Sequence, residues 1–128
     1  MKAYITCPVS HTNTRLDLLP EIKKIAEEAG LDTYVFEVGG TPEDIFKRDH
    51  DQLKSCDLII AEVSETSHGV GIEIGMSFFI GMKRILLLEK GKEVTKLAQG
   101  MPNTKIIHYQ NLEDLKSKLI HALSEMSS

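Results

Sequence analysis

Apolar residues along the chain fall into short β-rich runs, which alternate with longer stretches in which apolar positions recur at helical spacing. The run DLIIAEV is almost continuously apolar, as is typical of a strand covered on both faces. Helix boundaries are marked by Gly30, a favoured C-cap, and by Thr41-Pro42 followed by two acids, a favoured helix start. The pattern predicts strands at Ala3–Cys7, Thr33–Phe36, Leu58–Val63, Ile85–Leu88 and Lys105–His108, and helices at Thr14–Ala29, Thr41–Lys54, Val70–Gly81, Val94–Gln99 and Leu112–Ser124.

Strict alternation of strands and helices favours a single α/β domain over residues 1–128. We expect a five-stranded parallel sheet flanked by helices, which is a three-layer sandwich of the flavodoxin-like or Rossmann-like kind. In open sheets of this kind, ligands bind beyond the carboxyl ends of the strands. The pattern therefore predicts ligand contacts from three loops, at Pro8–Asn13, Val38–Thr41 and Ser64–Gly71.

The overall composition narrows the class of function. The chain has 128 residues, 41% of them hydrophobic, a net charge of −4 and basic residues that are scattered rather than clustered. A nucleic acid polymer or an anionic membrane is therefore not the expected partner. No apolar stretch approaches the roughly 20 residues that cross a bilayer, and the N-terminus lacks the basic-then-apolar order of a signal peptide. Because Cys7 and Cys56 both lie in apolar segments, we expect reduced, buried thiols in a cytoplasmic protein.

The stretch SETSHGVGIEIG places one carboxylate, Glu73, between a glycine-rich loop and an apolar helix. A position near a helix N-terminus favours the ionised carboxylate by about 0.3–1 kcal/mol when it is exposed. A charged carboxylate at the strand ends suits a nucleophile or an electrostatic stabiliser. The alternative is that Glu73 only complements the helix dipole or assists capping.

A second carboxylate, Asp49, lies on the apolar face of the helix that precedes the third strand. It shares this face with Ile45, Leu53 and Cys56. An inward carboxylate must be paired or protonated, and burial raises its pKa. The alternative is a residue at the rim of the core that is capped or paired with Arg48 or Lys47. Two carboxylates in different environments can divide the roles of nucleophile and general acid, as in retaining glycoside hydrolysis.

The glycine loop before Glu73 is not a dinucleotide fingerprint, because it follows the third strand and its glycines have the wrong spacing. Ser67, Gly69 and the first N–H groups of the next helix are suited to cradle an anion, whereas the alternative for Ser67 is a plain N-cap. The histidines show no metal-ligand spacing, and no Ser-His-acid pattern is present. His11 and His68 lie in the predicted ligand-side loops. They are expected either to contact an anionic ligand or to be solvated.

The central block RDHDQLKSCDLIIAEVSETSHGVGIEIG places an Asp before an Asp-apolar-apolar-apolar-Ala-Glu strand and a Ser-x-Gly-x-Gly-x-Glu loop. KAYITCPV precedes this block and KRILLL follows it, so that the three segments span most of residues 2 to 100. Together they resemble the nucleoside 2-deoxyribosyltransferase family and, within it, the 2′-deoxynucleoside 5′-phosphate N-hydrolases.

The resemblance implies roles for individual residues. Glu73 matches the family nucleophile, and Asp49 matches the acid that protonates the departing base. Tyr4 matches the tyrosine beside the nucleophile and the sugar C2′. Ser67 and Gly69 match the loop that contacts the phosphate.

The resemblance also implies a homodimer. Thr95 lies where the family sends a small hydroxyl residue from the neighbouring subunit into the site. Each site is then completed across the interface, to which the apolar helix Ile74–Met82 is expected to contribute.

Two loops depart from the pattern of the hydrolases. Their first loop is rich in glycine and arginine, so phosphate contact here falls to hydroxyls, backbone N–H groups, His11 or Arg15. Glu37-Val38-Gly39 lacks the histidine that follows the glutamate in the hydrolases. The candidate substrate contacts of the first loop are Cys7, Pro8, Val9, Ser10, His11, Thr12, Asn13 and Arg15.

Two residues separate the branches of this family. Ser67 stands where the free-nucleoside transferases typically carry an Asp that binds the sugar 5′-hydroxyl, and a serine at a helix N-terminus favours a 5′-phosphate instead. Tyr4 similarly implies a 2′-deoxy sugar. The expected reaction is hydrolysis of 2′-deoxynucleoside 5′-monophosphates through a glycosyl ester of Glu73, without a metal or organic cofactor. The alternatives are base exchange on free deoxynucleosides by a transferase and a nucleotide-binding module without turnover.

Overall fold

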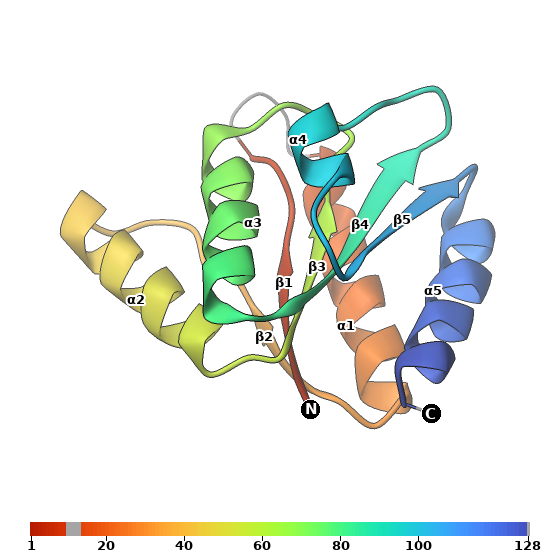
Figure 1. Ribbon diagram of the computed structural model, residues 1–128, viewed down its shortest axis with the longest axis horizontal. Helices are drawn as coiled ribbons and strands as arrows, with labels where there is room; N and C mark the ends of the chain where they lie inside the picture. Colours follow the sequence, from red (N-terminus) through yellow and green to blue (C-terminus); the bar gives the residue numbers. More distant parts are fainter. Residues whose placement is uncertain (10–13, 128) are drawn as a thin grey trace.

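The computed structural model describes residues 1–9 and 14–127 (Figure 1). Five strands form one sheet in which every neighbouring pair is parallel, in the order β2-β1-β3-β4-β5. This is the doubly wound, flavodoxin-like strand order, so the predicted fold class is confirmed. The strands are β1 (Lys2–Thr6), β2 (Asp32–Val35), β3 (Leu58–Glu62), β4 (Lys83–Glu89) and β5 (Thr104–Tyr109).

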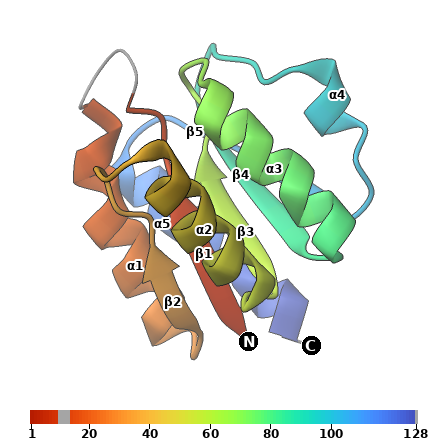
Figure 2. The same ribbon diagram turned by 90° about the vertical axis from the view of Figure 1, so that its left-hand side faces the viewer.

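Helices cover both faces of the sheet (Figures 1 and 2). One face carries α1 and α5, and the other carries α2 and α3, with the short α4 near the β5 side of that face. The helices are α1 (Leu19–Glu28), α2 (Pro42–Lys54), α3 (His68–Ile80), α4 (Lys96–Gln99) and α5 (Leu112–Ser127), and a 3-10 turn, η1 (Thr14–Leu18), precedes α1.

Every predicted strand and helix is present, but the helix starts differ from the prediction by one residue in α2 and by two residues in α4, which begins at Lys96, and they also differ in the first and third helices. The predicted first helix begins with the 3-10 turn η1, and the α-helix itself begins at Leu19. Pro20 lies in the first turn of α1, where its missing N–H is tolerated. The third helix begins at His68, two residues earlier than predicted. Ser67 caps it, since its Oγ accepts a hydrogen bond from the Val70 N–H at 3.3 Å.

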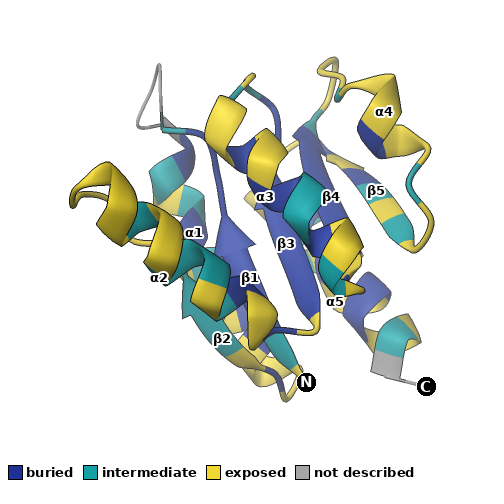
Figure 3. Cartoon of the chain, turned by 60° about the vertical axis from the view of Figure 1, so that its left-hand side comes forward, coloured by how far each residue is buried: buried dark blue, intermediate teal, exposed yellow. Residues whose placement is uncertain are grey.

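Apolar side chains alternate between the two faces of the sheet and form a core on each. Leu58 and Ile60 of β3 pack with α1 and α5, whereas Ile59 and Ala61 pack with α2 and α3. The three central strands β1, β3 and β4 are therefore largely buried, whereas the edge strands β2 and β5 and the outer helix surfaces are more exposed (Figure 3). The same alternation sends Glu62 toward the face that carries α1 and α5.

Candidate active site

Glu73 points from α3 onto the carboxyl end of β1, where two hydroxyl groups hold its carboxylate. The Tyr4 hydroxyl donates a hydrogen bond to Oε2, and the Thr6 hydroxyl donates one to Oε1 at 3.0 Å. Tyr4 and Thr6 are two residues apart on β1 and therefore present their side chains to the same face. Glu73 is only 6% exposed. The nucleophile candidate is thus buried and held at both oxygens by neutral donors.

Burial has the largest effect on the pKa of Glu73. It raises the pKa of this carboxyl to about 7, although the hydrogen bonds from Tyr4 and Thr6 favour the ionised form and lower it. Burial therefore outweighs the preference for the ionised form that the sequence predicts from the helix N-terminus. Glu73 lies in the second turn of α3, beyond the first turn in which the dipole acts most strongly. Burial and the neighbouring Glu73 also raise the pKa of the Tyr4 hydroxyl, which keeps it a hydrogen-bond donor.

Asp49 faces the same cavity from α2, with a side chain that is 16% exposed. Its Oδ1 lies 3.6 Å from the Arg48 Nε and has no hydrogen-bond partner among the described residues. Arg48 instead donates hydrogen bonds to the backbone oxygens of Glu37 and Gly39, at 2.7 and 3.1 Å. Burial raises the pKa of Asp49, although Arg48 lowers it. The predicted alternative, a pair with Arg48, is present only as a long ion pair. The raised pKa makes Asp49 suited to hold a proton.

Glu73 and Asp49 open onto one cavity of about 220 Å³ at the carboxyl end of β1. The order of the strands reverses between β1 and β3, so this is the topological switch point at which such folds bind ligands. The predicted residues that line the cavity are Glu73, Asp49, Cys7, Val9, Ser67 and Gly69, and the others are Thr6, Phe36, Glu37, Val38, Gly39, Ile45 and Val70.

The N-terminus of α3 reaches this cavity at Ser67 and Gly69. The predicted N-cap role of Ser67 is confirmed by its bond to the Val70 N–H. The unpaired N–H groups and the dipole of this 13-residue helix favour an anion at its start. Contact of Ser67 and Gly69 with a phosphate stays a prediction.

The first loop contributes less than the sequence analysis expects. Cys7 lines the cavity, but burial raises the pKa of its thiol to about 12, so it forms a neutral wall. Pro8 is buried. Four of the predicted substrate contacts, Ser10, His11, Thr12 and Asn13, lie outside the described residues.

Arg15 is engaged in an ion cluster. Its guanidinium lies 3.9 Å from Glu62 and 3.0 Å from Glu65, and it also pairs with Glu89. The Arg15 side chain is 10% exposed and is not among the described residues that line the Glu73 cavity. The charge of Arg15 is therefore balanced by these carboxylates, which compete with a phosphate for the guanidinium. Contact of Arg15 with a phosphate stays a prediction.

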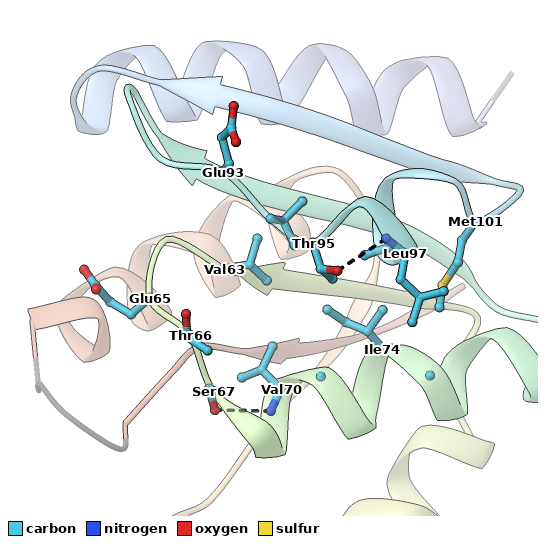
Figure 4. A pocket seen from close by; sticks show the side chains of 14 residues that line it. Val63, Glu65, Thr66, Ser67, Val70, Ile74, Glu93, Thr95, Leu97 and Met101 are labelled. Carbon is cyan, nitrogen blue, oxygen red and sulfur yellow. Dashed lines mark hydrogen bonds between the residues drawn. The ribbon is translucent and has the colours of Figure 1, made fainter.

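Thr95 lines a second cavity of about 310 Å³ between α3 and α4 (Figure 4). Within its own chain it caps α4, because its Oγ1 accepts a hydrogen bond from the Leu97 N–H at 3.3 Å. Ser67 and Val70 line both cavities and form the wall between them. A role of Thr95 in the site of a neighbouring subunit stays a prediction.

Thr6, Phe36 and Ile45 also line the cavity but were not predicted from the sequence. The signal for Thr6 was its position two residues after Tyr4 on the same strand face. Ile45 shares the helix face of Asp49, and Phe36 ends the predicted second strand. All three follow from periodicity once the cavity is placed.

Other kinds of site find no support in the described part of the chain. No group of three or more His, Cys, Asp or Glu side chains within residues 1–9 and 14–127 is arranged to hold a metal ion. Over the same residues, no helix has the length and apolar character needed to span a membrane. Cys7 and Cys56 are both buried free thiols, as predicted.

The fold and the carboxylate pair define a class of protein. A buried carboxylate held by hydroxyls, opposite a second carboxylate with a raised pKa, suits nucleophilic displacement at a glycosidic carbon with acid assistance to the leaving group. The cavity at the switch point of a flavodoxin-like sheet is where such a substrate would bind.

Comparison with known proteins agrees with this class. No model of a known protein family matches the chain. It is 29% identical over 132 residues to a protein of Thermofilum pendens named as a candidate 2′-deoxynucleoside 5′-phosphate N-hydrolase 1, covering 93% of this chain and 92% of the relative. A protein of Syntrophotalea carbinolica with the same name is 35% identical over 94 residues, covering 70% of this chain and 66% of the relative. The solved CMP N-glycosidase of Clostridium botulinum superposes with a TM-score of 0.71 and 26% identity, covering 93% of this chain and 98% of that one.

The chain therefore belongs to the nucleoside 2-deoxyribosyltransferase family, as its motifs indicate. At the level of the family it is an enzyme of the glycosidase kind, within the group of N-deoxyribosyl hydrolases and transferases.

Proposed function

We propose that this protein hydrolyses the N-glycosidic bond of 2′-deoxynucleoside 5′-monophosphates, giving the free base and 2-deoxyribose 5-phosphate. The observation that carries the proposal is the buried Glu73 carboxylate, which Tyr4 and Thr6 hold at the cavity shared with Asp49. The names of the two relatives support the substrate class, since both are named as N-hydrolases of 2′-deoxynucleoside 5′-phosphates.

The proposed reaction is a double displacement. The ionised Glu73 attacks the sugar C1′ while the bond from C1′ to the base breaks, and the proton of Asp49 passes to the leaving base. The sugar is then held as an ester of Glu73. The Asp49 carboxylate next takes a proton from a water whose oxygen attacks C1′, which frees Glu73 and restores the protonated Asp49. The proposed reaction requires no metal or organic cofactor.

The walls of the cavity support the rest of the substrate. Tyr4 does not line the cavity but is fully buried against Glu73; in the proposed complex it lies next to the sugar C2′, which favours a sugar without a 2′-hydroxyl. The N-terminus of α3 at Ser67 favours the 5′-phosphate, because Ser67 adds a hydroxyl and no negative charge. Phe36 and Ile45 offer an apolar wall for the base beside Asp49.

We further propose a homodimer that acts in the cytoplasm. Large apolar side chains on α3 and α4 are exposed in the single chain, namely Ile72, Phe78, Phe79 and Leu97. An exposed apolar surface of this kind is typical of a protein–protein contact. In such a dimer Thr95 of one subunit would reach the Glu73 cavity of the other, and sedimentation at several protein concentrations measures whether the dimer forms.

The test of the reaction is base release, measured by chromatography, from the four 2′-deoxynucleoside 5′-monophosphates with and without a second free base. Unphosphorylated deoxynucleosides and ribonucleotides serve as controls, together with Glu73→Gln. We expect release from the deoxy monophosphates alone, abolished in the variant. Base exchange on unphosphorylated deoxynucleosides would identify a transferase instead. Tight nucleotide binding by the wild type with no base release would identify a binding module.

A further inference from the structure

Glu62 is a second buried carboxylate, at the end of β3 on the sheet face opposite Glu73, and the proposed reaction does not use it. It is fully buried. Its Oε1 accepts a hydrogen bond from the Ser64 N–H at 2.8 Å, and its Oε2 accepts one from the Ser64 hydroxyl at 2.6 Å. The Tyr109 hydroxyl also donates to Oε2. Both oxygens of Glu62 are therefore occupied by donors.

These bonds join four elements in one polar cluster. The Ser64 Oγ also accepts a hydrogen bond from the Glu89 N–H at 2.8 Å, which attaches the start of the β3–α3 loop to β4. Tyr109 belongs to β5, and Arg15 of η1 lies 3.9 Å from Glu62. A carboxylate with this many partners fixes the backbone beside it, since each partner restricts the position of the others.

The loop that Glu62 anchors leads directly to the cavity. Only Glu65 and Thr66 separate Ser64 from Ser67, the N-cap of α3 (Figure 4). Because the connection is so short, a displacement of Ser64 should also displace Ser67. Ser67 in turn lines the Glu73 cavity at the helix end that favours an anion.

We infer that Glu62 is a positioning residue, which holds Ser64 and so sets where Ser67 and the N-terminus of α3 meet the substrate phosphate. The inference rests on the proposed function, because the phosphate is part of that proposal. Glu62 does not touch the Glu73 carboxylate, whose donors Tyr4 and Thr6 lie on the other face of the sheet. Loss of Glu62 should therefore weaken phosphate binding and leave bond cleavage nearly unchanged.

The test is Glu62→Gln, which keeps the size of the side chain but replaces one acceptor oxygen with a donor. At least one of the three donors then loses its partner. We expect the KM for a deoxynucleoside monophosphate to rise about tenfold, and the dissociation constant of inorganic phosphate, measured by calorimetry, to rise equally. The kcat should stay within about twofold of the wild type, because the Glu73 site is intact.

Two further variants keep the test decisive. Ser64→Ala removes the hydroxyl bridge while leaving the buried carboxylate in place, and it should give the same split in KM and kcat if Glu62→Gln fails to fold. Ser77→Ala is the matched control for a lost buried hydroxyl. Ser77 Oγ donates to the Ile74 oxygen at 2.6 Å and accepts from Arg84 at 3.2 Å, away from the cavity. This control should lower Tm and leave KM unchanged.

The outcomes separate the inference from the function on which it rests. Folded variants with unchanged phosphate affinity, or with a lower kcat at unchanged KM, would overturn the positioning role. A wild type that binds phosphate but releases no base would refute the hydrolase, and the shift in phosphate affinity would still decide the role of Glu62. A wild type that releases base but binds no inorganic phosphate would overturn the positioning role alone.

Discussion

Glu62 and Glu73 are both buried carboxylates near the carboxyl ends of the strands, and hydroxyl groups donate hydrogen bonds to both, but they differ in their charged neighbours. Glu62 accepts hydrogen bonds from Ser64 and Tyr109 and has the Arg15 guanidinium at 3.9 Å. Glu73 is held by neutral hydroxyls and forms no ion pair with any residue that the structure describes. The guanidinium adds a charged contact that holds Glu62 in place, whereas Glu73 faces a cavity in which a substrate can reach it. The contrast supports the proposed reaction at Glu73 and the proposed positioning role of Glu62.

The largest effect is expected from Glu73→Gln. The amide keeps the shape of the side chain but cannot form the ester with C1′, so kcat should fall by at least about 10³-fold. Circular dichroism should show an unchanged fold, because a neutral side chain suits this buried position. A loss of less than about tenfold in a folded variant would show that Glu73 is not the nucleophile.

The next effect is expected from Asp49→Asn. Without the proton donor, release of an ordinary base should slow by about 10²-fold or more. A base that already carries a positive charge, such as an N7-methylated purine, needs no proton and should lose far less. Comparing the two substrates in wild type and variant measures this. Equal losses for both would contradict the role of Asp49 as general acid.

Tyr4→Phe tests how the hydroxyl donors of Glu73 affect its protonation. Wild-type kcat/KM should rise with pH up to about 7, because only the ionised Glu73 attacks and its pKa is about 7. The Tyr4 hydrogen bond favours the ionised form, so its removal raises the pKa of Glu73 and moves the acidic limb to higher pH. Rate profiles from about pH 5 to pH 9 measure the shift. A limb that stays in place or moves to lower pH would mean that the hydroxyl does not stabilise the reactive form.

The smallest effect comes from Ser67→Ala, and Thr41→Ala is its matched control. Both residues cap helices of 13 residues, with hydrogen bonds of 3.3 Å for Ser67 and 3.1 Å for Thr41. Each change should lower the free energy of unfolding by about 1 kcal/mol. Only Ser67→Ala should also raise the KM for the monophosphate, by a few-fold. An equal rise in KM for both variants would remove Ser67 from the phosphate site.

The fold was predictable because buried strands and capped helices leave local signals. The continuous apolar run of β3 and the Thr41-Pro42 start of α2 each depend on residues close together in the chain. The inward face of Asp49 followed from helical spacing alone. The position of Thr6 was predictable in the same way, once Tyr4 was placed on the functional face.

The electrostatics were not predictable, because they depend on contacts between distant residues. The pKa of Glu73 is determined by burial against β1, and its partner Tyr4 lies 69 residues away in the sequence. Arg15 is a candidate phosphate ligand by residue type alone. Its pairing with Glu65, 50 residues away, appears only in the folded chain.

The order of the elements along the chain also bears on when the site can form during synthesis. Tyr4, Thr6 and Glu73 all belong to elements that end by Ile80, whereas Tyr109, a donor to Glu62, belongs to the last strand. A domain generally folds as a unit, so a nascent chain that lacks β5 already contains Glu73 and its donors but not a complete domain. We therefore expect the Glu73 site and the anchor of the β3–α3 loop to form together, once β5 has been synthesised.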